Sequence, residues 1–261
     1  MTTLLEKIRK VNRVLELSED SNLHFANLSK ILTEVMECNV YIASTDGKLI
    51  GYSFAEFYDC ELNLKTLQEQ GTKFPSQFNE FINTINDTVS NKIDTSPECV
   101  YDHSYNCQYS HRYSTYVPIN SGGERLGTLV LAKFSQEFTE EDLILAEVSA
   151  TVVGMEMMRI KNYELEKNAR ERTIVQMAVA TLSYSEIEAV HHIFDELKGD
   201  EGLLVASKIA DRAGITRSVI VNALRKFESA GVIETRSLGM KGTFIKILND
   251  HLFEELQSLK N

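Results

Sequence analysis

The stretch from Glu140 to Leu182 contains no proline, and this feature constrains the fold more than any other. Thr139 and three acidic residues stand at its start, which is typical of an N-cap followed by a first helical turn. The first part of the stretch is apolar enough to pack against a domain, whereas the part from about Arg159 to Arg172 is highly charged. We therefore expect one long helix that closes a domain and then continues as a linker.

A chain of 261 residues divided in this way has room for two domains, and 43% hydrophobic residues can supply a core for each. We expect an N-terminal domain over 1–138, the terminal helix and linker over 139–182, and a C-terminal domain over 183–261. The sequence has no apolar run long enough for a membrane span and no signal-peptide pattern, so no membrane partner is expected. The four cysteines form no CxxC pair, which favours free thiols in the cytoplasm.

The C-terminal domain has the pattern of three helices and a hairpin. Apolar residues recur at helical spacing over 183–197 and 202–214, and Gly214 precedes a third helix that Thr216 caps. On this third helix we expect Val219, Val221 and Leu224 to be buried. Two short strands then flank the turn 239–242, and together these elements predict a winged helix-turn-helix.

Charge supports DNA as the partner of this domain. The chain carries a net charge of −11, but residues 203–246 hold eight basic and three acidic side chains, a net +5 that leaves −16 on the remainder. Because the start of a recognition helix reaches base edges in the major groove, we predict base contacts from Thr216, Arg217, Ser218 and Asn222. Phosphate contacts are predicted for Arg225, Lys226, Arg236 and Lys241. The alternative is a helical hairpin with a solvated basic face.

The N-terminal domain has a mixed pattern, so the fold class is α+β. Helices are expected over 3–17, 26–36 and 61–70, and a long functional loop over 71–112. Strands are expected over 39–44 and 48–53 around Asp46-Gly47, and again over 113–119 and 125–134. The last two strands and their turn resemble the closing hairpin of GAF domains, which bind small ligands in a pocket over the sheet.

Several segments resemble the CodY family, the global nutrient-responsive transcriptional repressors of low-GC Gram-positive bacteria. They include "GGERLGTLVL" (122–131), "DLILAE" (142–147), "ATVVGME" (150–156) and nearly all of 201–243. The resemblance implies a homodimer that binds operator DNA, has no catalytic cofactor, and responds to isoleucine, valine or leucine, with GTP as a second effector. It places the amino-acid effector near Leu64, Leu67, Phe74, Pro75, Cys99, Val100 and Tyr101. It places GTP near Ser44, Lys48 and Glu156.

The sequence departs from the family pattern at two points. The family's arginine for the effector carboxylate is missing from "DCELNLK" (59–65), which leaves backbone amides or Lys65 as its partner. Thr45 and Asp46 stand where the family has a basic pair, and the carboxylate of Asp46 would repel phosphate.

Two other functions remain open, although the sequence holds no Ser-His-Asp, paired-carboxylate or HExxH arrangement and we do not expect an enzyme. A GTPase is one alternative, because "NKID" (91–94) resembles a guanine-recognition motif and "SGGERLGT" (121–128) is glycine-rich. The glycine-rich stretch lacks the Gly-Lys-Ser/Thr ending of a P-loop. A metal- or redox-responsive regulator is the other, because Cys99, His103, Cys107 and His111 recur every four residues and are all acceptable zinc ligands.

A dimer is expected for a second, physical reason. One short recognition helix rarely provides enough DNA affinity, and twofold proteins match two half-sites. Val152, Val153, Met155 and Met157 are the apolar residues near the linker that we expect to be available for such a contact.

Overall fold

The computed structural model describes residues 3–14, 21–60, 73–95, 98–99, 106–109, 111–134, 136–197 and 199–258. The chain forms two compact units, Met1–Asn162 and Tyr163–Asn261. The expected long helix is present as α5 (Glu140–Ala180), and the units divide inside it. Thr139 caps α5 as expected, because its Oγ1 accepts a hydrogen bond from the Asp142 amide at 3.2 Å.

The first unit is built on a five-stranded antiparallel sheet. Its strands are β1 (Asn39–Ser44), β2 (Leu49–Ser53), β3 (Val89–Asp94), β4 (Arg112–Ser121) and β5 (Glu124–Lys133), in the order β2-β1-β5-β4-β3. The β1–β2 and β4–β5 hairpins confirm the strands predicted around Asp46-Gly47 and around Gly122-Gly123. Strand β3 and helix α4 (Ser76–Asn83) lie in the stretch predicted as one long loop, so that prediction was wrong in part.

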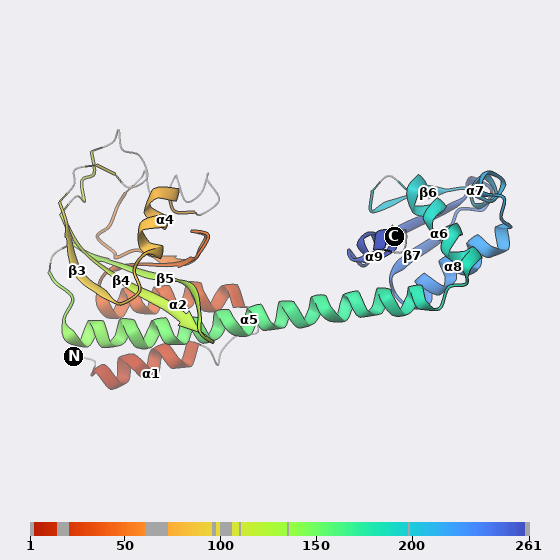
Figure 1. Ribbon diagram of the computed structural model, residues 1–261. Helices are drawn as coiled ribbons and strands as arrows, with labels where there is room; N and C mark the ends of the chain where they lie inside the picture. Colours follow the sequence, from red (N-terminus) through yellow and green to blue (C-terminus); the bar gives the residue numbers. More distant parts are fainter. Residues whose placement is uncertain are drawn as a thin grey trace. The chain divides into compact units, whose positions relative to one another are not determined.

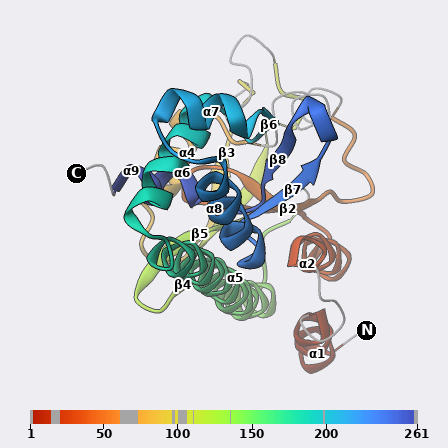
Figure 2. The same ribbon diagram turned by 90° about the vertical axis from the view of Figure 1, so that its right-hand side faces the viewer.

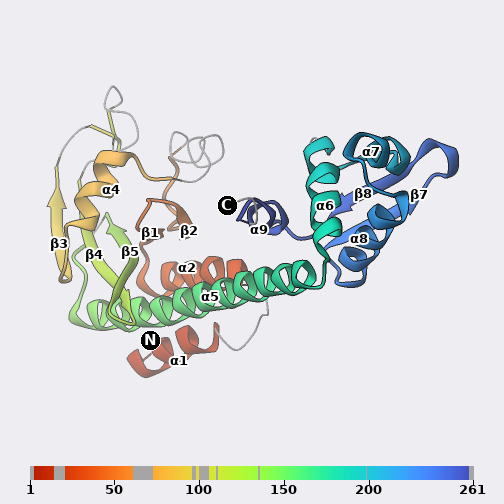
Figure 3. The same ribbon diagram turned by 45° about the vertical axis from the view of Figure 1, so that its right-hand side comes forward.

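Helix α2 (Ser21–Met36) and the start of α5 cover one face of this sheet, α1 (Leu4–Val14) lies beyond them, and α4 lies on the other face (Figure 1; Figure 3). The alternation of side chains along each strand explains the two faces. On β1, Val40 and Ile42 pack with Leu32 and Leu145 in one core, whereas Tyr41 and its neighbours pack with Phe74 in another. The helix predicted over 61–70 lies outside the described residues.

The described part of the second unit contains the end of α5, four further α-helices and the short 3-10 helix η1 (Gly239–Lys241). The four α-helices are α6 (Tyr184–Glu196), α7 (Ala206–Ala213), α8 (Arg217–Ser229) and α9 (Leu252–Ser258). Strands β6 (Glu201–Leu204), β7 (Ile233–Ser237) and β8 (Thr243–Ile247) form a sheet in the order β6-β8-β7. The predicted second helix is therefore shorter than expected, because residues 201–204 pair with β8 as a strand.

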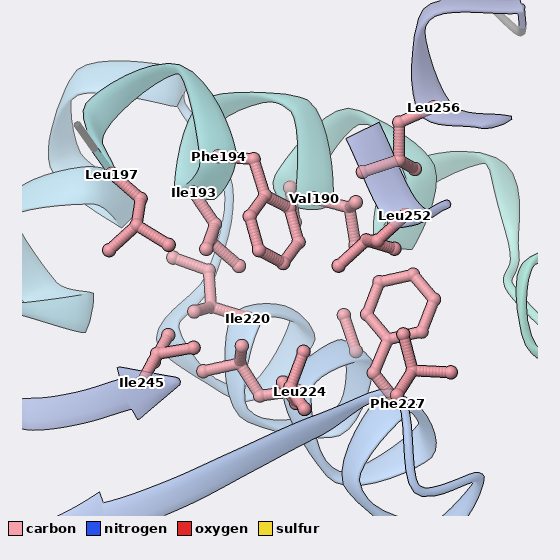
Figure 4. Close-up of a cluster of buried hydrophobic side chains, with 14 of the residues drawn as sticks. Val190, Ile193, Phe194, Leu197, Ile220, Leu224, Phe227, Ile245, Leu252 and Leu256 are labelled. Carbon is pink, nitrogen blue, oxygen red and sulfur yellow. The ribbon is translucent and has the colours of Figure 1, made fainter. Parts of the chain in front are cut away.

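The three helices and the β7–β8 hairpin are the predicted winged helix-turn-helix, and Figure 2 shows α6, α7 and α8 with the hairpin strands. Figure 4 shows its core, where Phe194 and Val190 of α6 meet Leu224 and Phe227 of α8. The prediction of which residues of α8 are buried was wrong at Val221. Ile220 is buried there, whereas Val221 is 38% exposed.

None of the described helices combines the length and the apolar content that a bilayer crossing requires.

Candidate ligand cavity and DNA-binding surface

A cavity of about 80 Å³ lies in the first unit, on the sheet face that carries α4. It is smaller than typical ligand pockets, which hold roughly 300–1,000 Å³. The described residues that line it come from β1, β4, β5, α4 and the adjoining loops: Asn39, Tyr41, Phe74, Phe78, Cys99, Cys107, Arg112, Ser114, Tyr116, Val130, Ala132 and Phe134.

Aromatic rings make much of the apolar wall. The ring of Phe74 lies 5.6 Å from that of Tyr41 and 4.9 Å from that of Phe78, between centroids. Burial raises the pKa of Tyr116, so this phenol stays neutral in the physiological range. Such a wall favours an aliphatic or aromatic group over a charged one.

Arg112 brings the only cationic side chain found among the described lining residues. Its side chain is 13% exposed, and its guanidinium pairs with the carboxylate of Asp94 on the neighbouring strand. Arg112 Nη1 also donates to the Tyr109 carbonyl oxygen at 3.3 Å. Sequence reasoning sought a cation between residues 59 and 65 and did not find this one, because only the β3–β4 register brings Arg112 beside Asp94.

The predicted effector residues divide into three groups. Phe74 and Cys99 line the cavity. Pro75 precedes α4 as its N-cap and is not one of the described lining residues. The others lie outside the described residues: Leu64, Leu67, Val100 and Tyr101. Lys65, the alternative carboxylate partner, lies outside them too.

The residues proposed for GTP lie in two different places in the first unit. Ser44 Oγ donates to Asp46 Oδ1 at 2.5 Å, and Lys73 Nζ lies 3.0 Å from Asp46 Oδ2. The hydrogen bond from Ser44, together with that from Lys73, lowers the pKa of Asp46 to about 2. This turn, which Lys48 adjoins, therefore presents a permanent carboxylate that disfavours phosphate. Glu156 is a buried residue of α5, and Arg159 donates to both of its carboxylate oxygens at 2.8 and 2.6 Å.

The motifs that suggested a GTPase have structural roles. Asn91 has a positive φ of 51°, its Nδ2 donates to the Phe138 carbonyl at 3.0 Å, and its Oδ1 accepts from the Phe138 amide at 2.7 Å. Asp94 pairs with Arg112. The glycine-rich stretch is the β4–β5 turn and not a strand-to-helix loop, so it has no helix N-terminus to bind phosphate. These contacts argue against the GTPase alternative.

The structure describes only part of the cysteine and histidine repeat. An isolated β-bridge joins Glu98 and Asn106, so the residues beside Cys99 and Cys107 are extended. Both cysteines line the cavity, His111 is exposed, and His103 lies outside the described residues. Within the part of the chain that the structure describes, no group of three or more metal-ligating side chains comes together.

The DNA-binding surface of the second unit begins at α8. Gly214 ends α7 in the left-handed conformation with φ 69°, and Thr216 is the N-cap residue of α8. Thr216 Oγ1 and Ser218 Oγ lie 2.8 Å apart and share a hydrogen bond. All four predicted base-contacting side chains are exposed at the start or along one side of this helix: Thr216, Arg217, Ser218 and Asn222.

The predicted phosphate contacts differ from one another. Arg225 on α8 and Arg236 and Lys241 on the wing are exposed. Lys226 instead donates to Glu186 Oε2 at 2.7 Å and to the Thr181 carbonyl at 2.8 Å. Its ammonium is already paired within the protein, so a phosphate would have to compete with Glu186 for it.

A small-molecule cavity over a GAF-like sheet, followed by a winged helix-turn-helix, defines a two-domain transcriptional regulator. Comparison with known families agrees. The model of the CodY GAF-like domain matches residues 3–181, and that of the CodY helix-turn-helix domain matches residues 200–260. The chain belongs to the CodY family of global transcriptional regulators, which are not enzymes.

Individual relatives are similar over the full chain. The global transcriptional regulators CodY of Clostridium perfringens (strain SM101 / Type A) and Clostridium botulinum (strain Okra / Type B1) are 54% and 53% identical over 260 residues, which is 100% of this chain and of each relative. The structure of the cofactor binding GAF domain of the nutrient sensor CodY from Clostridium difficile is 32% identical. The match covers 60% of this chain and 99% of the Clostridium difficile domain, with a TM-score of 0.43.

Proposed function

We propose that this regulator represses transcription in the cytoplasm and that a branched-chain amino acid in the cavity raises its affinity for operator DNA. The observation that carries the proposal is the composition of the cavity. Aromatic and aliphatic side chains form most of its wall, and the single cationic side chain described there suits one carboxylate. Isoleucine, valine and leucine match this chemistry because each joins a small aliphatic side chain to an α-carboxylate.

The effector must act by differential affinity. A ligand shifts a protein toward its DNA-binding state only as far as it binds that state more tightly than the other. Linkage is reciprocal, so operator DNA must tighten effector binding by the same factor. Helix α5 contributes residues to both units and is the element proposed to carry this coupling.

One titration tests the proposal. DNA affinity is measured for the full chain with and without isoleucine, and calorimetry then measures isoleucine binding with and without a DNA fragment that the protein selects. We expect both affinities to rise by the same factor. A folded protein that releases no heat at millimolar isoleucine, and whose DNA affinity isoleucine does not change, would refute the amino-acid response.

GTP is not favoured as a second effector by the described residues. The ordinary family contacts at Ser44 and Lys48 adjoin the carboxylate of Asp46, and Ser44 already donates to it. Asp46→Asn removes this negative charge. A GTP response that is absent in the natural chain and gained in Asp46→Asn would show that Asp46 excludes the nucleotide.

We also propose that the protein binds DNA as a homodimer. Val152 and Val153, which we expected to be available for the contact, are instead part of the domain core. Met155 of α5 is 52% exposed, and Met177, nearer the end of this helix, is 67% exposed. Both remain available for a second copy of the chain. Sedimentation of the free and the DNA-bound protein at micromolar concentration tests this assembly, and a monomer in both samples would exclude it.

A further inference from the structure

The sheet beneath the cavity changes from apolar to charged along its strands. Tyr41, Val130 and Tyr116 are paired across β1, β5 and β4 and form one row. Two residues along each strand, Asn39, Ala132 and Ser114 form the next row on the same face. Two residues further along β4 lies Arg112, paired with Asp94 of β3. The floor therefore offers an apolar surface at one end and polar groups at the other.

Asn39 has an unused hydrogen-bond donor at this polar end. The residue is 1% exposed and lines the cavity. Its Oδ1 accepts a hydrogen bond from the Ala55 amide at 2.9 Å, which fixes the orientation of the side-chain amide because the Ala55 N–H can bond only to the oxygen. Nδ2 then has no hydrogen-bond partner among the described residues. A buried donor without an acceptor is unfavourable, so a ligand oxygen here would restore a lost hydrogen bond.

Arg112 provides the charge. A guanidinium has five N–H groups in a planar fork, and a carboxylate can accept two of them at once. Asp94 and the Tyr109 carbonyl hold Arg112 from two sides, which fixes its head group beside the cavity before any ligand binds. Such preorganisation strengthens binding, because little side-chain entropy remains to be lost.

We infer that Asn39 Nδ2 and the guanidinium of Arg112 together bind the carboxylate of an aliphatic α-amino acid whose side chain lies over Tyr41, Val130 and Tyr116. This inference rests on the proposed function and names the residues that carry it out. Asp94 acts as a positioning residue through Arg112. The segment 59–65 has no arginine for the ligand carboxylate. In this assignment Asn39 on β1 and Arg112 on β4 bind it instead.

Calorimetry with isoleucine as the probe and the full chain as the protein tests the assignment. Arg112→Gln removes the charge, and Asn39→Asp removes the donor while it keeps an oxygen for the Ala55 amide. We expect each variant to bind isoleucine about tenfold more weakly or worse. Lys30→Gln is the matched control, because Lys30 is an exposed cation on α2, which covers the opposite face of the sheet. It should bind within about twofold of the natural chain, as surface charges contribute little.

A second ligand, isoleucinamide, distinguishes recognition of the carboxylate by Arg112 from a purely structural role of this residue. Isoleucinamide keeps the aliphatic side chain and the ammonium group but lacks the carboxylate. The natural chain should prefer isoleucine to isoleucinamide, and Arg112→Gln should lose most of this preference. Arg112→Lys, which keeps the charge, should recover part of it.

The outcomes are distinct. If the natural chain binds isoleucine and both variants bind it equally well, the assignment of Asn39 and Arg112 is wrong while the proposed function stands. If Arg112→Gln weakens isoleucine and isoleucinamide alike, Arg112 has only a structural role and the assignment is again wrong. If the folded natural chain does not bind isoleucine, the proposed function itself fails. Should Asn39→Asp not fold, the loss of ligand preference in Arg112→Gln decides the matter.

Discussion

Lys226 Nζ lies 2.7 Å from Glu186 Oε2 and so connects the recognition helix α8 to the first turn of α6. Glu186 also completes a capping box with Ser183, because its carboxylate accepts from the Ser183 amide at 2.7 Å. One carboxylate therefore caps the N-terminus of α6 and also holds α8 in place. The hydrogen bond from Lys226, with that from Ser183, lowers the pKa of Glu186 below its ordinary value.

Adjacent residues of α8 should separate stability from DNA binding. We expect Lys226→Met to lower the unfolding free energy of the C-terminal unit by about 1 kcal/mol, because a charged hydrogen bond is lost, and to leave the salt dependence of DNA binding unchanged. Arg225→Met should have the opposite profile and reduce the salt slope by about 1. Chemical denaturation and DNA titrations at several salt concentrations measure both quantities. A reduced salt slope in Lys226→Met alone would show that Lys226 leaves Glu186 for the phosphate.

Arg217 and Lys241 should differ in what they recognise. Arg217 is exposed at the first position of α8, where side chains reach base edges, so Arg217→Ala should weaken the preferred site by about 1–3 kcal/mol more than random DNA. Lys241 lies on the exposed wing, and Lys241→Ala should weaken both kinds of DNA equally. Competition binding with the two DNAs measures the difference. Unchanged binding by both variants would remove the winged helix from the interface.

A buried ion pair should make the first unit sensitive to acid. Lys133 Nζ lies 2.7 Å from Asp142 Oδ2, and both side chains are buried. Burial alone raises the pKa of Asp142, but the hydrogen bonds from Lys133 and Thr139 offset it, and the pKa lies below the ordinary 3.8. The stabilisation is thus complete above about pH 4 and is lost as the pH falls through the lowered pKa.

Asp142→Asn leaves Lys133 without its anion, so we expect a loss of about 3 kcal/mol at pH 7 and a flatter decline below pH 4. Glu141→Gln is the control, because Glu141 is exposed in the same helical turn. Calorimetric unfolding between pH 3 and pH 7 measures both effects. Equal stability of Asp142→Asn and Glu141→Gln at pH 7 would contradict the role given to this pair.

Two glycines of the wing should tolerate alanine differently. Gly242 has φ 116°, and a Cβ there would lie 2.4 Å from the Leu204 carbonyl oxygen of β6. Gly239 has φ 63°, and a Cβ there would meet nothing within 4 Å. Gly239→Ala should cost about 1 kcal/mol from backbone strain alone, and Gly242→Ala distinctly more, with weaker DNA binding. Denaturation of the two variants provides the comparison, and equal losses would mean that contact with β6 is unimportant.

The sequence alone determined the local elements and their kinds. Periodicity predicted α5 and α6, the Gly214–Thr216 turn predicted where α8 begins, and glycine-containing turns predicted three hairpins. These signals are local, because a helix start or a tight turn needs particular residues within a few positions. Residues 201–204 show the limit of this reasoning. Their helical pattern gave way to pairing with β8, a partner far along the chain.

Only the tertiary structure decided what several polar residues do. Asn39 and Arg112 reach one cavity because β5 lies between β1 and β4 in the sheet, and no local pattern encodes that order. The side-chain amide of Asn91, which stands in a motif that resembles a guanine-binding site, bonds to Phe138, and Lys226 on the basic helix α8 pairs with Glu186. The residue type fixes the charge and the hydrogen-bonding groups of a side chain. The partner that uses them is chosen by packing, because burial and distance set which interaction is strongest.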